Sequence, residues 1–255
     1  MNIIIIGAGN LASHLGRAFK EAGHSIKAIY NHRKTTSALE FAHELNARFS
    51  TDFNTIDTAD FYFIAVKDDA IEETVKRINV NSGVVLHTSG TISIDVLNKF
   101  KRFGVFYPVQ SFSKNIKLSF KSVPVCLEAS DQDVQKTLKE FARSLTNEVH
   151  FVSSEKRLKL HLAAVFVNNF TNYLFSISSE ILKKEEIPFN ILKPLAEETL
   201  RKVFDNSASI RDLQTGPAKR KDEKTIQSHL EILKDFPGEY AELYRVFTEN
   251  IRKMH

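Results

Sequence analysis

The first part of the chain, up to about residue 152, alternates short apolar runs with segments whose apolar residues recur at helical spacing. Short apolar runs between helices are typical of strands buried in a parallel sheet. Strands are predicted at Asn2–Ile6, Ser25–Tyr30, Phe61–Val66, Val84–His87, Gly104–Tyr107, Val123–Leu127 and Val149–Val152. Helices are predicted at Asn10–Ala22, Thr36–Leu45, Asp69–Ile78, Ser93–Phe100 and Asp133–Leu145. This order predicts an α/β fold with a doubly wound, mostly parallel sheet of the Rossmann type.

The pattern after Val152 contains only helices. Residues 154–184 hold no Gly or Pro, and apolar residues cover most of the circumference, so we expect one long helix buried by several neighbours. Further helices are predicted at Asn190–Asp205, Glu223–Asp235 and Gly238–Met254, with Asp222 as an N-cap and Pro237 at the start of the last one. We therefore expect a Rossmann domain at 1–152 and an all-helical domain at 153–255.

Composition narrows the class of protein. Of the 255 residues, 42% are hydrophobic and the net charge is +4, which gives no indication of a nucleic-acid surface. No apolar run reaches the roughly 18 residues of a membrane span, and the N-terminus lacks the features of a signal peptide. The lone Cys126 lies in an apolar run and is expected in the core. A cytoplasmic protein that binds neither membrane, nucleic acid nor metal is expected.

A glycine-rich loop, Gly7-Ala8-Gly9-Asn10-Leu11-Ala12, directly follows the first strand and begins a helix. In this context Gly7 permits a sharp turn, Gly9 lets the backbone approach a pyrophosphate, and a small Ala12 lets helix and strand pack closely. The helix N-terminus then offers N–H groups to the phosphates. The loop predicts a dinucleotide site that includes Ala8, Asn10 and Leu11; the alternative is a strand–helix turn that binds no cofactor.

The end of the second strand indicates which dinucleotide is bound. A carboxylate usually binds the ribose of NAD at this point, but the strand ends in Tyr30-Asn31-His32-Arg33-Lys34. We expect NADP, with Asn31 and Arg33 at its 2′-phosphate, although Arg33 and Lys34 are also ordinary surface charges. Val66 and Lys67, after a further strand, are expected to line the ribose and nicotinamide side. Asp68 or Asp69 is expected to cap the helix that follows.

The next strand ends in His87-Thr88-Ser89-Gly90. Ser89 and Gly90 are candidates to present a hydroxyl and a backbone N–H to a substrate oxygen, and Ser89 is also a candidate catalytic residue. His87 is a possible acid, but a lone histidine at a strand end is more often structural.

Polar residues interrupt the long apolar helix. His161 and Asn168 lie seven residues apart on one face, and Asn169 is close to that face. We take His161 as a candidate proton donor and Asn168 or Asn169 as candidates to orient a substrate oxygen; hydrogen bonds between helices are the alternative. Arg220 is a candidate ligand for a substrate carboxylate, or a solvated residue beside the Asp222 cap.

Several segments together resemble the Rossmann-like proteins that carry a DUF2520 domain. They are Gly7-Ala8-Gly9-Asn10-Leu11-Ala12, His87-Thr88-Ser89-Gly90, Tyr107-Pro108-Val109-Gln110-Ser111-Phe112, His161-Leu162-Ala163-Ala164 with Asn168-Asn169, and Thr215-Gly216-Pro217-Ala218-Lys219-Arg220-Lys221-Asp222. The resemblance spans nearly the whole chain. More distantly, the layout is similar to pyrroline-5-carboxylate reductase, ketopantoate reductase, β-hydroxyacid dehydrogenases and F420-dependent NADP reductases.

This resemblance implies an NADP domain, a helical domain like the C-terminal domain of 6-phosphogluconate dehydrogenase, and a homodimer formed through the C-terminal helices. It does not identify the substrate. β-Hydroxyacid dehydrogenases place a catalytic Lys four residues before an Asn of the long helix. This chain has Ala164 or Val165 there, depending on whether Asn168 or Asn169 corresponds.

The sequence therefore predicts an NADP(H)-dependent oxidoreductase that transfers hydride to or from a small carbonyl or imine compound. The alternative is a non-catalytic NADP-binding dimer with a regulatory or sensor role. Use of F420 as the hydride partner stays open.

Overall fold

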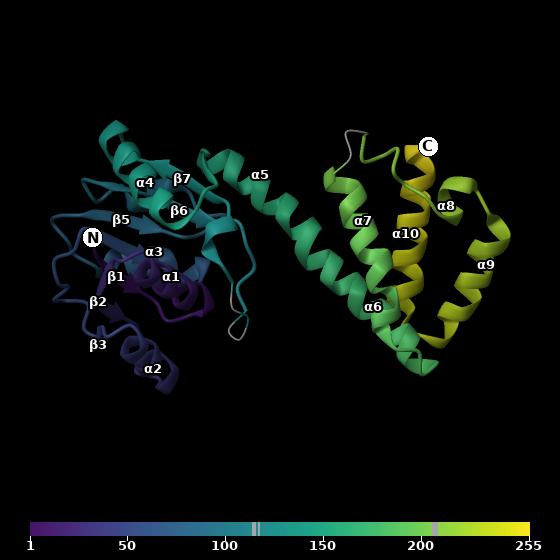
Figure 1. The fold of residues 1–255 in the computed structure, drawn as a ribbon, viewed down its shortest axis with the longest axis horizontal. Coiled ribbons are helices and arrows are strands. Elements are labelled where there is room, and N and C mark those ends of the chain that lie inside the picture. Colours follow the sequence, from purple (N-terminus) through teal and green to yellow (C-terminus); the bar gives the residue numbers. More distant parts are fainter. Residues whose placement is uncertain (114–115, 117, 206–208) are drawn as a thin grey trace. The chain divides into compact units, whose positions relative to one another are not determined.

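The structure is a computed structural model that describes residues 1–113, 116, 118–205 and 209–255 (Figure 1). Its contacts divide the chain into two compact units, unit 1 from Met1 to Asn168 and unit 2 from Asn169 to His255. We describe each unit by itself.

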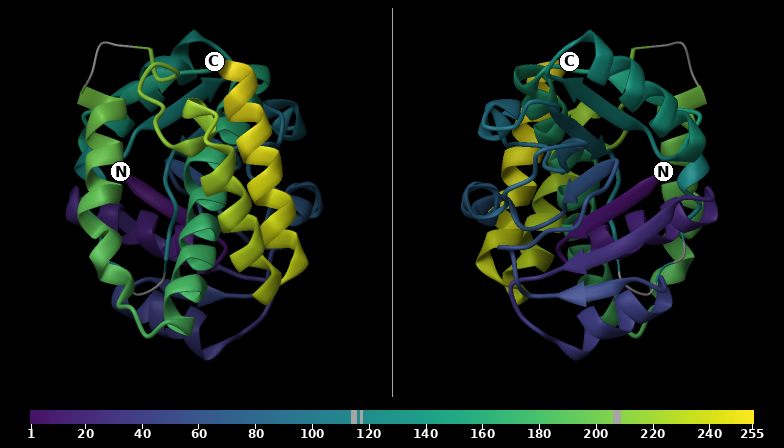
Figure 2. Two further views of the ribbon diagram at one scale, coloured as in Figure 1. Left: turned by 90° about the vertical axis from the view of Figure 1, so that its right-hand side faces the viewer. Right: turned by 90° about the vertical axis from the view of Figure 1, so that its left-hand side faces the viewer.

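Unit 1 is built on one eight-stranded sheet in the order β3-β2-β1-β4-β5-β6-β7-β8, whose strands lie side by side in Figure 2. The strands are β1 (Asn2–Ile6), β2 (Ser25–Tyr30), β3 (Arg48–Ser50), β4 (Phe61–Ile64), β5 (Val84–His87), β6 (Phe103–Pro108), β7 (Val125–Ala129) and β8 (Val149–Phe151). Only the β6–β7 pair is antiparallel among these strands. The expected doubly wound, mostly parallel sheet is confirmed.

Alternate residues of the central strands feed two cores, one on each face of the sheet. Ile3 and Ile5 belong to one core, and Ile4 and Ile6 belong to the other. The first core is covered by α1 (Asn10–Glu21), α2 (Thr36–Glu44) and α4 (Gln132–Leu145), and the second by α3 (Asp68–Arg77). The central strands are rich in apolar residues because most of their side chains are buried on one face of the sheet or the other.

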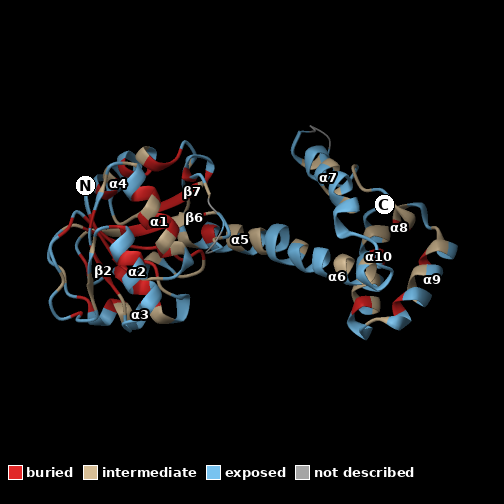
Figure 3. Ribbon diagram, turned by 60° about the horizontal axis from the view of Figure 1, so that its bottom comes forward, coloured by how far each residue is buried: buried red, intermediate tan, exposed pale blue. Residues whose placement is uncertain are grey.

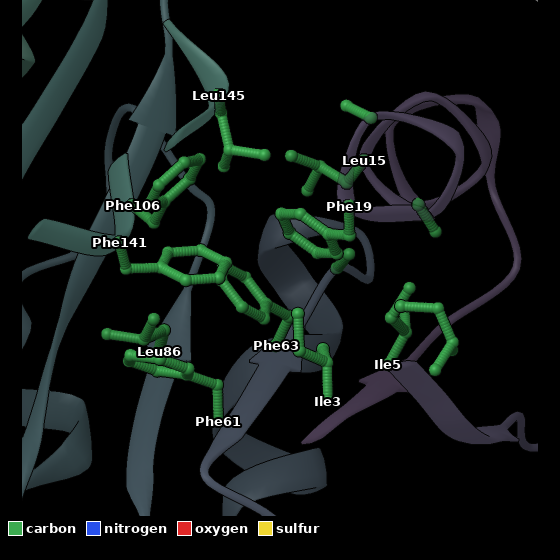
Figure 4. Packing of buried hydrophobic residues seen from close by; sticks show 14 of the residues in the cluster. Ile3, Ile5, Leu15, Phe19, Phe61, Phe63, Leu86, Phe106, Phe141 and Leu145 are labelled. Carbon is green, nitrogen blue, oxygen red and sulfur yellow. The ribbon is translucent and has the colours of Figure 1, made fainter. Parts of the chain in front are cut away.

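Aromatic rings fill the middle of the first core. The ring centroids of Phe19 and Phe63 are 4.6 Å apart, and that of Phe141 lies 5.4 Å from Phe19 and 5.7 Å from Phe63 (Figure 4). These side chains come from α1, β4 and α4. Each such ring buries a large apolar area, so this cluster fixes both helices on the sheet.

Two elements of unit 1 differ in kind from the prediction. The edge strand β3 was not expected, because its three residues are partly or fully exposed and form no apolar run. The predicted helix Ser93–Phe100 is only a short 3₁₀ turn, η1 (Ile94–Leu97). Cys126 is buried in β7 as expected.

All regular elements that the structure describes after β8 are helical. They are α5 (Ser154–Ala164), the π-helix η3 (Val165–Phe170), α6 (Thr171–Lys184), η4 (Phe189–Leu192), α7 (Lys193–Asp205), α8 (Pro217–Arg220), α9 (Glu223–Ile232), η5 (Leu233–Asp235) and α10 (Gly238–Met254). Asp222 caps α9 by accepting the Thr225 N–H at 3.1 Å, as predicted. Pro237 immediately precedes α10, also as predicted.

The expectation that the long helix is buried on several sides is wrong for this chain alone. Leu158, Leu162, Phe166 and Phe170 expose between 48% and 61% of their surface. Figure 3 shows the exposed colour along much of α6 and α7 as well. The apolar pattern favours burial of this surface, but it does not specify what covers it. No helix in the described ranges is long and apolar enough to cross a membrane.

Candidate functional site

The strand order reverses at β1, which places the ends of β1 and β4 at the point where ligands bind in open α/β sheets. The loop after β1 pairs with both neighbours here. The Gly7 N–H donates to the Tyr30 carbonyl of β2 at 2.7 Å, and the Ala65 N–H donates to the Ile6 carbonyl at 2.8 Å. The glycine-rich loop is thus held between the ends of β2 and β4.

The two glycines of this loop serve different purposes. Gly7 has φ +120°, and a Cβ there would lie 2.2 Å from the Ala65 carbonyl oxygen, so the fold itself requires glycine. A Cβ on Gly9 would meet nothing within 4 Å, so this backbone borders open space. Gly9 caps α1 without a side-chain hydrogen bond, and the helix dipole favours an anion at this end. Ala12 is fully buried against the sheet, as the fingerprint requires.

A cavity of about 730 Å³ opens in front of this loop, a volume within the usual range of ligand pockets. Its lining includes residues predicted to contact the cofactor: Gly7, Ala8, Gly9, Asn10, Leu11, Asn31, Val66 and Lys67. Arg33 is exposed and lies outside the lining. The Asn31 amide donates to the Arg33 carbonyl at 2.8 Å and so holds the turn after β2.

Sequence reasoning missed the part of the cavity lining that α3 and Phe53 contribute. The Arg77 guanidinium lies over the Phe53 ring, 4.7 Å from its centroid, and both residues line the cavity. Ala70, Thr74 and Arg77 line it from one face of α3 at helical spacing, a pattern that was readable in the sequence. Among the described lining residues, Lys67 and Arg77 are positively charged.

The carboxylates at the start of α3 do not cap the helix as expected. Lys67 occupies the N-cap position without a side-chain hydrogen bond. The Asp68 carboxylate instead accepts the Thr91 hydroxyl at 2.6 Å and so joins α3 to the loop after β5.

The loop after β5 begins with a buried histidine. The His87 side chain is fully buried and its Nδ1 accepts the Ser89 N–H at 3.2 Å. Burial, and then the charge of Arg157, lower the pKa of His87 to about 4, so the ring is neutral at pH 7. This environment favours the structural interpretation of His87 over a role as an acid.

The Ser89 hydroxyl holds the same loop. It accepts the N–H groups of Thr91 at 3.0 Å and Ile92 at 3.1 Å, and Ser89 is only 5% exposed. The lone pairs of the Ser89 hydroxyl oxygen therefore accept hydrogen bonds from the turn. The contact of Ser89 with a substrate stays a prediction.

His161 of α5 lies beside this loop within unit 1. Its Nδ1 is 3.1 Å from the Tyr107 hydroxyl of β6. A Cβ on Gly90 would lie 2.7 Å from the same nitrogen, so the imidazole packs directly on the Gly90 backbone. The structure thus brings together His161, predicted as a proton donor, Gly90, predicted as a substrate contact, and Tyr107, for which no role was predicted.

A buried ion pair anchors the helix that carries His161. Arg157, which is 1% exposed, pairs with Glu128 of β7 and donates to the Ile92 carbonyl. Ser154 adds hydrogen bonds to Glu128 from its N–H at 2.8 Å and from its hydroxyl at 2.7 Å. The start of α5 is therefore fixed to β7 and to the loop after β5.

The remaining predicted residues lie elsewhere along the chain. Asn168 and Asn169 are exposed and occupy the π-helix η3, a type of helix often found at functional sites. Arg220 is exposed at the end of α8 in unit 2. The roles predicted for these three residues stay predictions.

Two family models match the chain. The model described as "Domain of unknown function (DUF2520)" matches residues 123–251, and the model described as "NADP oxidoreductase coenzyme F420-dependent" matches residues 2–99. No curated protein matches the chain.

Solved structures resemble the chain over its whole length. A Bacteroides fragilis protein provisionally named as an NADP oxidoreductase is 38% identical, with a TM-score of 0.91 over 99% of this chain and 98% of that one. A 1-pyrroline-5-carboxylate reductase from Streptococcus pyogenes is 16% identical, with a TM-score of 0.69 over 99% and 98%. An imine reductase from Myxococcus stipitatus in complex with NADP⁺ is 14% identical, with a TM-score of 0.62 over 99% and 92%. The last two show the shared fold alone.

Proposed function

The chain belongs to the family of Rossmann-like proteins with a DUF2520 domain and an N-terminal domain of the NADP oxidoreductase type, and from this premise we propose that it is an NADP(H)-dependent oxidoreductase. Its substrate is a small carbonyl or imine compound that exchanges hydride with the cofactor. Bound NADPH supplies the hydride, and the protein positions the acceptor carbon and delivers a proton.

The observation that carries this proposal is the cavity at the end of β1. Its glycine loop fits a pyrophosphate, because the Gly9 backbone faces open space at the start of α1, where no side chain caps the helix. Val66 and Lys67 would line the cofactor on the β4 side, and Asn31 on the β2 side. The donor set thus fits a dinucleotide by shape and by charge.

Two features favour NADP over NAD, and one opposes it. The turn after β2 carries Asn31 and His32 in the cavity lining, with no carboxylate to bind a ribose 2′-OH or to repel a 2′-phosphate. Arg77 of α3, whose guanidinium lies over the Phe53 ring, adds a positive charge to the cavity lining. Glu73 also lines the cavity, one turn of α3 before Arg77, and its charge partly offsets that of Arg77.

His161 is the proton donor in this proposal. It lies against Tyr107 of β6 and Gly90 after β5, and β5 is the neighbour of β4, whose end lines the cavity; His161 itself is outside the lining. Asn168, Asn169 and Arg220 are proposed to contact the substrate, with Arg220 suited to a carboxylate. One observation favours the alternative, a non-catalytic NADP-binding sensor: Ala164 or Val165 stands where β-hydroxyacid dehydrogenases carry a catalytic Lys.

The proposal is tested first by binding. NADPH is expected to raise the melting temperature more than NADH at equal concentration, and Arg77→Ala should remove most of that difference. Arg33→Ala is measured beside it, and the larger loss identifies which of the two arginines holds the 2′-phosphate. Equal shifts for both cofactors with the unaltered protein would contradict the preference for NADP.

The second test is turnover. NADPH oxidation is measured spectrophotometrically with 1-pyrroline-5-carboxylate, 1-pyrroline and pyruvate, and with further small keto acids and cyclic imines. An enzyme should reduce at least one compound, and His161→Ala should lower kcat by about 100-fold or more. Tight NADPH binding without any turnover, or turnover that does not depend on His161, would favour the sensor.

We also propose that two copies associate through the C-terminal helices, in a cytoplasmic protein. Unit 2 exposes Ile191 by 65%, Leu195 by 66% and Phe204 by 73%, and exposed apolar side chains that gather on one surface are typical of an interface. Sedimentation velocity should give a dimer, and Leu195→Glu should shift it towards the monomer. Lys136→Glu, an exposed charge change on α4, is the control. A monomer at micromolar concentration would contradict this association.

A further inference from the structure

Two residues of unit 1 pack directly against the His161 ring. Tyr107 is near the end of β6, and Gly90 is in the loop after β5. The Tyr107 and His161 rings are 6.1 Å apart at their centroids and inclined by 63°, with the Tyr107 hydroxyl 3.1 Å from Nδ1. A Cβ on Gly90 would lie 2.7 Å from Nδ1 and 2.9 Å from the Tyr107 Cζ. Both rings therefore need glycine at position 90.

The contacts around His161 differ between its two ring nitrogens. Nδ1 faces the Tyr107 hydroxyl, whereas Nε2 makes no hydrogen bond within the described part of the chain. The hydrogen bond that one imidazole nitrogen makes determines which proton the other one carries. Tyr107 thus orients the ring through Nδ1 and leaves Nε2 available.

Two further observations make this pair rigid. Arg157 lies four residues before His161, one helical turn away, and its buried pair with Glu128 fixes α5 to β7. Arg157 also donates to the carbonyl of Ile92, in the loop that carries Gly90. His161 and the loop that carries Gly90 are consequently held by one connected set of hydrogen bonds and an ion pair.

We propose that Tyr107 is the positioning residue for proton delivery by His161, so that the proton leaves from Nε2. This inference rests on the proposed function. The imidazolium donates Nδ1–H to the Tyr107 oxygen and Nε2–H to the substrate. Hydride from NADPH forms the new C–H bond while the C=N or C=O π bond breaks, and the Nε2 proton forms the N–H or O–H bond. NADPH becomes NADP⁺, and the neutral His161 regains its proton from water.

The chemistry of Tyr107 suits this role. Burial raises the pKa of the Tyr107 hydroxyl, so it stays protonated and does not compete as the proton source. A neutral hydroxyl accepts from Nδ1–H before and after transfer, which keeps the same tautomer through the cycle. The arrangement corresponds to the base and its orienting group in hydrolytic triads, on an unrelated fold.

The first experiment needs no substrate. Long-range ¹H–¹⁵N NMR spectra of the full chain report which nitrogen of His161 carries the proton, with His161→Asn used for assignment. The neutral ring should be an Nδ1–H tautomer, and Tyr107→Phe should shift it towards the Nε2–H form that is usual in solution. Tyr62→Phe removes another buried hydroxyl of unit 1, which bonds the Asp57 carbonyl, and should leave His161 unchanged. An unchanged tautomer in Tyr107→Phe overturns the inference.

The second experiment measures turnover of whichever panel compound the unaltered protein reduces. Tyr107→Phe should lower kcat by about 10- to 100-fold, with a shifted pH profile and unchanged NADPH binding. Gly90→Ala should have a similar effect, because its Cβ displaces the His161 ring. Unchanged kcat in Tyr107→Phe refutes the positioning role, whereas absence of turnover in the unaltered protein refutes the proposed function and leaves the NMR result to decide the pairing.

Discussion

The buried His87 makes stability depend on pH in a way that can be calculated. Its pKa is lowered from 6.5 to about 4 in the folded chain, first by burial and then by the charge of Arg157. The unfolded chain therefore takes up a proton near pH 6.5, and the folded chain does so only near pH 4. The sign follows directly: stability present above pH 6.5 is lost as the pH falls towards 4.

The size of the effect comes from the same two values. A shift of about 2.5 pKa units corresponds to about 3.4 kcal/mol when the loss is complete. At pH 5 the unfolded state is almost fully protonated and the folded state is not, so about 2 kcal/mol of unfolding free energy should already be lost.

The assay is urea unfolding followed by circular dichroism at pH 7.5 and pH 5, at one protein concentration. His87→Asn removes the titrating ring but keeps an acceptor for the Ser89 N–H. The stability difference between the unaltered protein and His87→Asn should therefore fall by about 2 kcal/mol from pH 7.5 to pH 5.

A neutral change in the same loop serves as the control. Thr88→Val removes the buried hydrogen bond from the Thr88 hydroxyl to the Ile64 carbonyl, and its cost should not vary with pH. If the difference for His87→Asn is also the same at both pH values, His87 is not buried as a neutral ring and the reasoning fails.

Two other predictions test the loop and the ion pair. Gly7→Ala should lower the melting temperature because its Cβ meets the Ala65 carbonyl, whereas Gly9→Ala should keep the melting temperature and weaken NADPH binding in a fluorescence titration. If both variants lost NADPH binding but had the same melting temperature, the two glycines would not have separate roles. Glu128→Ala should cost about 3–5 kcal/mol in urea unfolding, because it leaves buried Arg157 without its partner. The double change Glu128→Leu with Arg157→Met should lower the unfolding free energy by less than Glu128→Ala does. An equal loss would show that the unpaired charge of Arg157 does not cause the destabilisation.

Local pattern was sufficient for most of unit 1. The apolar runs predicted β1, β2 and β5 with their observed bounds, because most side chains of these strands are buried on one face of the sheet or the other and are apolar. The glycine loop was readable for a similar reason, since its geometry depends on backbone freedom at Gly7. The edge strand β3 was not readable, because an exposed edge puts little constraint on side chains.

In the candidate site, too, local features were predictable from the sequence and contacts between distant segments were not. The sequence alone determined the glycine-rich loop, the change to helices after β8 and His161 as a residue of interest, since each depends on neighbours in the chain. Only the tertiary structure placed Tyr107 and Gly90 against His161, Glu128 against Arg157, and Arg77 in the cavity wall. These partners meet through the order and register of the strands, and that packing is fixed by contacts between distant segments that no local periodicity encodes.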